Sequence, residues 1–515
     1  MVDAATHTPP SLRRWSLALA IGVPVACWVR LGQDANWDLR NYHLYNPHAW
    51  LHGRYTTDIA AAQQQTWHNP LLDVPLYLLS AAPGWIAGLW LLLPFVLALA
   101  CLLRLHAHLL GPRASAGGQV ALALLATTGA AAYPTLGTSL NDAFVAAGVL
   151  AAGWVLLRGG APRGRDWLVA GALLGGVTGL KLTAAPYCLA LALAAAVAGP
   201  VRGAPARLAW LALGGVLGFA LTFAWWGWTV YRLHGSPVFP YLNAWFQSPD
   251  ALPRELADSR FRPAGVVDAL AIPLRLLQSS TRYSELVLRD PRLLLGLLAG
   301  AFLAWRHRRA AATWPLAAFF CAGLALWAGM YGIYRYVLPL EMLACLFVVL
   351  ALDTLPRGRG VLLALATLAI FAFTVQPDWG RVRFGPRFAS AAWPALPPGT
   401  LVVIATGEPV AYAAIGLPDD IALVSARNNF MFPARCTRLQ ARVEQQLRTH
   451  PGPMYLLRPP AGDDVDRALL ADGYGLELAG ACGTVGSGLG TLSLCPLRRD
   501  PRPTLCAATA ATPGR

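Results

Sequence analysis

Carboxylates, histidines, amides and aromatic rings are concentrated in one stretch near the start of the chain. It begins with WDLRNYHLYNPHAW at residues 37–50 and continues to HNPLLD at residues 68–73. A carboxylate can accept the proton of an attacking hydroxyl group, and Asp38 is the first candidate for such a general base. Asp34 and Asp58 lie in the same loop as Asp38. A single loop aspartate is more often a helix cap or a solvated charge, so that alternative stays open for Asp38.

A second set of charged residues interrupts the apolar part of the sequence. Asp142 lies in SLNDAFVAAG, Lys181 in GGVTGLKLTAAP and Arg335 in GIYRYVLPLE. Charged side chains are costly at membrane depth, so they are functional candidates there. Asp142 is either a second catalytic carboxylate or a helix cap, and the two cations could hold a phosphate group. The alternatives for the cations are a lysine that extends to the membrane surface and an arginine that anchors a helix at the interface.

Polar and aromatic residues beside these groups are candidates for binding a substrate. Histidines are more often structural than catalytic, so His43 ranks below Asp38 as a base. No spacing of potential ligands indicates a metal site, and use of a divalent metal stays open. The segment GSGLG at residues 486–490 lacks the lysine of a phosphate loop, which favours a turn. The substrate-binding candidates are Arg40, Tyr42, His43, His68, Asn69, Asn141 and Tyr334.

The composition indicates what kind of protein positions these residues. Of 515 residues, 56% are hydrophobic and 13% are charged, against about a quarter charged in soluble domains. Mean hydropathy is +0.47. A membrane barrel would show apolar residues alternating with a period of two, and the sequence shows no such alternation. We predict an α-helical polytopic membrane protein with about 11 transmembrane helices. The expected spans are residues 15–31, 85–103, 118–133, 140–157, 167–180, 182–198, 208–230, 293–305, 314–333, 336–352 and 361–375.

The net charge of +15 is better explained by membrane topology than by nucleic-acid binding. Arginines occur in alternate connections, which predicts that those connections and the N-terminus are cytoplasmic. The expected membrane is the inner membrane of a bacterium. The loop 32–84, the connection 231–292 and the C-terminal part are then periplasmic. The cytoplasmic arginines are Arg13, Arg14, Arg104, Arg113, Arg158, Arg163, Arg165, Arg202, Arg207, Arg306, Arg308, Arg309, Arg357 and Arg359.

The chain changes character after the last expected span. Residues 1–377 form the expected transmembrane domain, residues 378–498 a small α/β periplasmic domain, and residues 499–515 a disordered tail. Within the connection 231–292, VVDALAIPLRLLQ predicts an amphipathic helix at the membrane interface. Cys482 and Cys495 could pair in an oxidising periplasm, although the four cysteines of this domain allow three connectivities.

The order of these motifs resembles the GT-C superfamily of membrane glycosyltransferases, in particular its protein mannosyltransferase and aminoarabinose transferase branch. The resemblance rests on Asp38 after the first span, NPL at residues 69–71, NDAFVAAG, GGVTGLKLTAAP and YRYVLPLE, and covers about residues 15–355. Two positions differ from the family pattern, which has an acidic residue at Leu39 and proline at Asn69. The acceptor and any metal are therefore left open.

The resemblance implies transfer of a sugar from an undecaprenyl-phosphate-linked donor to a hydroxyl-bearing acceptor, which is a lipopolysaccharide, another glycan, a lipid or a protein. It implies that Asp38 is the general base and Asp142 a supporting carboxylate. Lys181 and Arg335 would contact the donor phosphate. Two alternatives remain, a polymerase or ligase of lipid-linked oligosaccharides and a transporter or flippase. A transporter is less favoured, because these charges cluster at one surface instead of lining a path.

Overall fold

The computed structural model describes residues 10–306, 313–355, 358–431, 436–461, 464–500 and 506. The chain falls into two units. The helical unit consists of Met1–Gly32, Leu89–Ala224 and Asp258–Trp379, and the sheet unit consists of Gln33–Gly88, Trp225–Ala257 and Gly380–Arg515. The domain expected at residues 378–498 is therefore only one part of the sheet unit. Most of the expected tail at residues 499–515 lies outside the described residues, as do His307 to Arg309 and Arg357 of the expected cytoplasmic connections.

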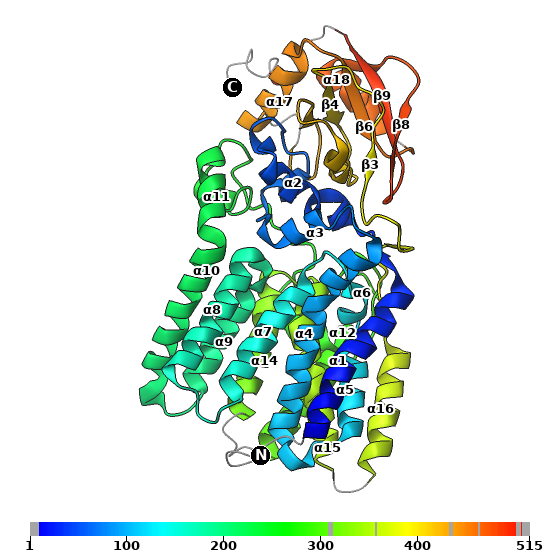
Figure 1. Cartoon of the computed structure of the whole chain (residues 1–515). Helices are drawn as coiled ribbons and strands as arrows, with labels where there is room; N and C mark the ends of the chain where they lie inside the picture. The colour runs from blue at the N-terminus through cyan, green and yellow to red at the C-terminus, as the bar shows by residue number, and fades with distance from the viewer. Residues whose placement is uncertain are drawn as a thin grey trace. The chain divides into compact units, whose positions relative to one another are not determined.

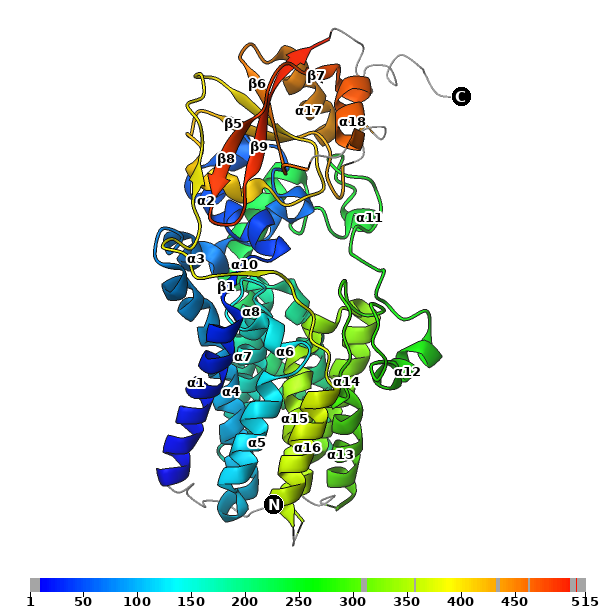
Figure 2. The same cartoon turned by 90° about the vertical axis from the view of Figure 1, so that its right-hand side faces the viewer.

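The helical unit is built from long apolar helices that lie side by side (Figures 1 and 2). Each expected span overlaps a helix, but the one expected at residues 118–133 runs past the end of α5 at Thr127 into a turn and the start of α6. Among the described residues, four helices are long and apolar enough to cross a membrane, and they cover Arg14–Leu31, Gly84–Arg113, Val201–His234 and Tyr334–Asp353. The number of crossings therefore stays a prediction. The helices are α1 (Pro10–Leu31), α4 (Gly84–Leu110), α5 (Ala116–Thr127), α6 (Ala132–Thr135), α7 (Asp142–Leu157), α8 (Gly164–Leu180), α9 (Ala185–Val197), α10 (Ala204–His234), α12 (Val266–Arg275), α13 (Arg292–Arg306), α14 (Thr313–Met330), α15 (Leu338–Asp353) and α16 (Arg359–Phe373).

Glycines with a four-residue spacing bring α8 and α10 together. Gly171 and Gly175 lie on α8, and Gly214 and Gly218 lie on α10. A Cβ atom added to any of them would collide with a backbone carbonyl oxygen of the facing helix. Small residues at this spacing allow close backbone approach in membranes, where apolar side chains gain little by leaving lipid. The contact fixes α8, and with it the residue that follows its end, Lys181.

A buried group of charges holds α15 against the turn before α6. Asp290 accepts hydrogen bonds from the N–H of Ala130 at 2.8 Å and from Nη1 of Arg292 at 2.9 Å. Glu341 accepts from the N–H groups of residues 131 and 132 at 2.9 and 3.0 Å. Buried charges are stable only when paired and hydrogen-bonded in this way. Glu341 therefore fixes the start of α15, directly after the segment that carries Arg335.

The sheet unit contains a mixed sheet with the strand order β3-β8-β9-β6-β4-β5, and β7 also pairs with β9. Strands β4, β5 and β6 are parallel, with Leu401 opposite both Ala422 and Met454. Helices follow β5 and β6 as expected for an α/β arrangement. The elements are β3 (Ala391–Ala392), β4 (Leu401–Ile404), β5 (Ala422–Ser425), α17 (Arg438–Thr449), β6 (Met454–Arg458), α18 (Asp464–Tyr474), β7 (Leu476–Leu478), β8 (Gly483–Ser487) and β9 (Leu492–Arg499), and a separate pair is formed by β1 (Gln33–Asp34) and β2 (Arg381–Val382).

Two disulfides cross-link the C-terminal part of the sheet unit. Cys482 pairs with Cys495 across the β8–β9 hairpin, and Cys436 pairs with Cys506 over a separation of 70 residues. The structure thus contains one of the connectivities that the sequence left open. Arg499, Asp500 and Cys506 of the expected tail belong to the described residues, where Arg499 ends β9 and Cys506 is disulfide-bonded.

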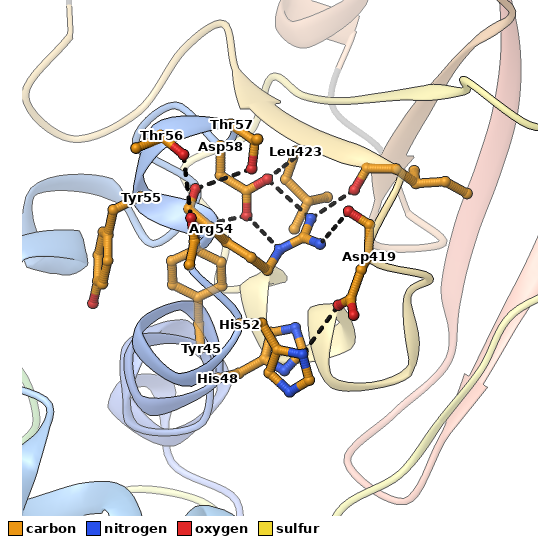
Figure 3. Close-up of polar contacts among 12 residues, drawn as sticks. Tyr45, His48, His52, Arg54, Tyr55, Thr56, Thr57, Asp58, Asp419 and Leu423 are labelled. Atoms are coloured by element: carbon orange, nitrogen blue, oxygen red, sulfur yellow. Dashed lines mark hydrogen bonds and ion pairs between the residues drawn. The ribbon is translucent and has the colours of Figure 1, made fainter.

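The polar segment that follows α1 is folded onto the edge of this sheet. Its main chain at Ile59 forms a parallel bridge with Val424 of β5. Arg54 donates through Nη2 to the carbonyl oxygen of Ile421 at 2.6 Å, and Asp58 accepts from the N–H of Leu423 at 2.9 Å. Figure 3 shows Arg54 and Asp58 facing each other beside Leu423. The sheet therefore positions residues 54–59, which lie between the two polar motifs of the sequence.

Candidate active site

An ion triplet of Asp142, Lys181 and Arg335 lies within the helical unit. Oδ1 of Asp142 is 2.5 Å from Nζ of Lys181, and its Oδ2 is 3.5 Å from Nη1 of Arg335. Lys181 also donates to the carbonyl oxygen of Leu140. The side chain of Asp142 is 3% exposed, whereas those of Lys181 and Arg335 are 14% and 13% exposed. The carboxylate is thus buried behind two cations that reach the surface of the unit.

Interruptions of the helices place these three residues. Asn141 precedes α7 with a φ of 61°, so the chain turns sharply and Asp142 opens the helix, where a carboxylate interacts favourably with the helix dipole. Lys181 has an extended backbone, with φ of −143° between α8 and the short 3-10 helix Leu182–Ala184. Arg335 lies in another 3-10 helix, Tyr334–Val337, which directly precedes α15. The start of α7, the break after α8 and the 3-10 helix before α15 therefore bring Asp142, Lys181 and Arg335 together.

The ring of Tyr336 lies beside both cations. Nζ of Lys181 lies 5.5 Å from the ring centre of Tyr336, and the guanidinium carbon of Arg335 lies 4.8 Å from it. The hydroxyl of Tyr187 donates to the carbonyl oxygen of Tyr336 at 2.5 Å. An aromatic face attracts cations and limits their motion. The arrangement therefore presents two ordered positive charges that can receive an anion.

A histidine and tyrosine cluster forms in the sheet unit. Nδ1 of His43 is 2.8 Å from Oδ2 of Asp73, and both side chains are almost completely buried. The ring of Tyr42 packs 4.0 Å from His43 and 5.0 Å from His68. Nε2 of His68 is 2.9 Å from the hydroxyl of Tyr241. The carboxylate fixes the orientation of His43, as carboxylates do for many functional histidines.

The remaining candidates lie in different surroundings. Asp38 is half-buried directly before the π-helix Leu39–His43. Asn69 accepts from the N–H of Leu71 at 3.1 Å and so shapes its own loop. Burial raises the pKa of Tyr412, while its hydrogen bond with Ser487 and the nearby charge of Arg40 lower it, which places Arg40 beside the C-terminal part of the sheet unit. Tyr334 is completely buried, so its side chain does not reach the surface at which Arg335 is partly exposed.

The structure thus brings the sequence candidates together in two groups. Asp142, Lys181 and Arg335 form one group, and Tyr42, His43 and His68 form the other. Sequence reasoning missed Asp73 and Tyr241, which hold the two histidines. The aspartate at the end of HNPLLD was a usable signal, because it follows a histidine-containing motif at short range. No pattern in the sequence linked Tyr241 to residue 68. Within the described ranges, no three His, Cys, Asp or Glu side chains are arranged to hold a metal ion.

The helix bundle and the mixed sheet define a membrane protein with the fold of the GT-C superfamily, as the sequence resemblance predicted. One solved structure with this fold is ArnT from Cupriavidus metallidurans bound to undecaprenyl phosphate. It aligns with a TM-score of 0.57 over 95% of this chain and 98% of that chain, at 12% sequence identity. The similarity is therefore one of fold. No protein-family model and no curated protein sequence matches the chain.

Proposed function

We propose that this protein is a glycosyltransferase that moves a sugar from an undecaprenyl-phosphate-linked donor to a hydroxyl group of a glycan, lipid or protein in the periplasm. The observation that carries this proposal is the pairing of Lys181 and Arg335 around Asp142 in a chain with this fold. The ArnT structure supports it, because that protein is bound to undecaprenyl phosphate. Preorganised cations stabilise the charge that develops on a leaving phosphate.

The reaction breaks the bond between the anomeric carbon and the phosphate oxygen, and the polyprenyl phosphate leaves with the electron pair. The acceptor oxygen forms the new glycosidic bond. Asp38 takes the proton of the acceptor hydroxyl, and Lys181 and Arg335 hold the phosphate. Asp142 is the supporting carboxylate that pairs with both cations. The proposed sugar-binding side chains are Arg40, Tyr42, His43, His68 and Asn69, and Asn141 and Tyr334 support the segments that carry Asp142 and Arg335.

The disulfides favour the proposed periplasmic location of the sheet unit. Disulfides form and persist in oxidising compartments such as the bacterial periplasm. Both disulfides lie in the C-terminal part of the sheet unit, while five cysteines described elsewhere in the structure are free thiols. This distribution agrees with cytoplasmic placement of the N-terminus and an odd number of membrane crossings.

The test combines a gene deletion with point variants of the full chain. Glycans and lipids extracted from the deletion strain should lack one sugar modification that the wild-type gene restores. Asp38→Asn and Lys181→Gln should fail to restore it, because the first removes the base and the second removes a phosphate contact. Asp166→Asn is the matched control, since Asp166 lies in the first turn of α8, about 22 Å along that helix from Lys181.

An assay with purified protein in detergent tests the transfer reaction directly. Wild type should release undecaprenyl phosphate from an undecaprenyl-phosphate sugar donor when an extracted acceptor is added. Full complementation by Asp38→Asn would rule out Asp38 as the base. An unchanged glycan and lipid profile in the deletion strain, together with no release from any donor tested, would refute the proposed function.

A further inference from the structure

The buried carboxylate of Asp142 lies against the cations that would bind the donor. It contacts Lys181 at 2.5 Å and Arg335 at 3.5 Å, while the cations themselves reach the surface of the helical unit. An arriving phosphate can therefore meet the exposed sides of the cations while Asp142 remains behind them. The two cations then attract the phosphate, whereas the carboxylate of Asp142 repels it.

The proposed reaction changes the charge of the lipid. The donor is a phosphodiester with one negative charge, and the product is a phosphate monoester with about −1.5 to −2 charges at pH 7, because its second pKa is about 6. Repulsion by a fixed carboxylate grows in proportion to the charge of the ligand. Asp142 therefore weakens binding of the product about twice as much, in free energy, as binding of the donor.

We propose that Asp142 is a specificity-determining residue that disfavours the phosphate monoester and so promotes release of the spent lipid. This inference rests on the proposed function, and it assigns Asp142 a role other than proton transfer. Its position also excludes direct competition with Asp38 for the acceptor proton, because the side chain is 3% exposed and both its oxygens face cations.

A purely structural role for Asp142 predicts a different result. A carboxylate in the first turn of a helix stabilises that helix, so its loss would loosen α7 and weaken binding of every ligand. Loss of a fixed negative charge should instead strengthen binding of anions, and more so for a dianion. The sign and the ligand dependence of the change distinguish the two roles.

The experiment measures binding of two lipids to the full-length protein in detergent by isothermal titration calorimetry. The probes are undecaprenyl phosphate, which is the monoester, and its methyl ester, which is a phosphodiester with one charge at every pH used. At pH 8 we expect Asp142→Asn to tighten binding of the methyl ester by roughly tenfold and that of the monoester by roughly 100-fold, at one and two ligand charges. Asp142→Ser, which keeps a hydroxyl at the helix start, is the second variant.

The pH supplies an internal control. At pH 5 the monoester carries a single charge, so Asp142→Asn should tighten both lipids by the same factor. Among the described residues that contact the ion triplet or the ring of Tyr336, the titratable types are Asp, Lys, Arg and Tyr, which do not ordinarily titrate between pH 5 and 8. They are Asp142 on α7, Lys181 after α8, Tyr187 on α9, Tyr331 after α14, and Arg335 and Tyr336 before α15.

The outcomes separate this inference from the function on which it rests. A larger gain for the monoester at pH 8 that disappears at pH 5, with no gain in the Asp166→Asn control, supports the inference. Weaker binding of both lipids, or an equal gain at pH 8, overturns it and leaves the phosphate site intact. If wild-type protein binds neither lipid while it remains folded, the proposed function fails and the inference fails with it.

Discussion

Arg54 and Asp58 form a two-point ion pair inside the sheet unit, with both the Nε–Oδ2 and the Nη2–Oδ1 distances at 2.9 Å. Neither side chain is more than 2% exposed. The hydroxyl of Tyr45 donates to the same carboxylate at 2.9 Å. Because the remaining hydrogen bonds of the pair go to the main chain before and within β5, one buried contact joins the polar segment to the sheet.

Breaking this pair should destabilise the sheet unit strongly. Asp58→Asn leaves the Arg54 guanidinium buried without its counter-charge, a change that typically costs about 3–5 kcal/mol. We expect a large fall in the unfolding midpoint of the full chain in detergent, measured by tryptophan fluorescence. Glu477→Gln is the control, because Glu477 pairs with Arg498 at the surface, where an ion pair contributes about 0–1 kcal/mol. Equal shifts for the two variants would contradict the prediction.

The sheet unit should lose stability in mild acid through His48. Burial of this ring lowers its pKa, with help from the charges of His52 and Arg54, from the usual 6.5 to about 4. The unfolded chain therefore binds more protons than the folded chain between these values, so stability falls as the pH drops from 6.5 to 4. The loss should reach about 2 kcal/mol at pH 5. Denaturant unfolding at pH 7 and pH 5 measures it.

A histidine replacement tests the origin of that loss. His48→Asn removes the titrating ring, and the difference between pH 7 and pH 5 should shrink by most of the His48 contribution. His108→Asn is the matched control, because His108 lies on α4 in the helical unit and not in the sheet unit. A pH dependence that survives in His48→Asn would assign it to another group.

Close packing of α8 and α10 should be needed to place Lys181. Gly175→Leu puts a side chain where even a Cβ would strike the backbone of α10, so the helices must separate. We expect lower thermal stability and at least a tenfold loss of undecaprenyl phosphate affinity, because the cation is displaced. Gly153→Leu on α7 is the control, since a Cβ there meets no atom within 4 Å. Normal lipid binding by a folded Gly175→Leu variant would refute the link.

Reduction should weaken the C-terminal part of the sheet unit. The Cys482–Cys495 bond closes a loop with a sequence separation of 13, and a loop of this size contributes about 3 kcal/mol in the chain-entropy model. Cys482→Ser should therefore lower the unfolding midpoint and make the remaining protein less sensitive to dithiothreitol. Cys321→Ser, which removes a free thiol, should change neither. Identical behaviour of the two variants would indicate that the hairpin is stable without its cross-link.

The apolar segments were predictable as helices because a membrane-spanning helix needs about 20 largely apolar residues, and each segment overlaps a helix. The ion triplet was predictable in part, since Asp142, Lys181 and Arg335 are costly charges in apolar surroundings and need partners. The sequence could not reveal that Asp58 accepts a hydrogen bond from Leu423, because that contact spans 365 residues and depends on which strand forms the sheet edge. Tyr241 was missed for the same reason, as its partner His68 is 173 residues away.

Local structure also escaped prediction where the backbone adopts rare conformations. Gln63 has a φ of 56°, a left-handed conformation that is uncommon for residues other than glycine. Its side chain nevertheless bridges the segments that follow β4 and β5, donating to the carbonyl oxygen of Gly407 and accepting from the N–H of Asn429. Tertiary contacts of this kind override the local preference of the residue, so they are visible only in the folded chain.

The bridge between Ile59 and Val424 has a genetic consequence. A nonsense mutation shortly after residue 378 spares the codons of every residue proposed to act on the donor or the acceptor. The resulting polypeptide lacks β5, so residues 54–59 have no strand to pair with and the charge of Arg54 loses its carbonyl partner at Ile421. Such an allele should behave as a complete loss of function. Expression of residues 379–515 as a separate polypeptide in the same cell tests whether residues 54–59 can pair with β5 when the two are not covalently linked.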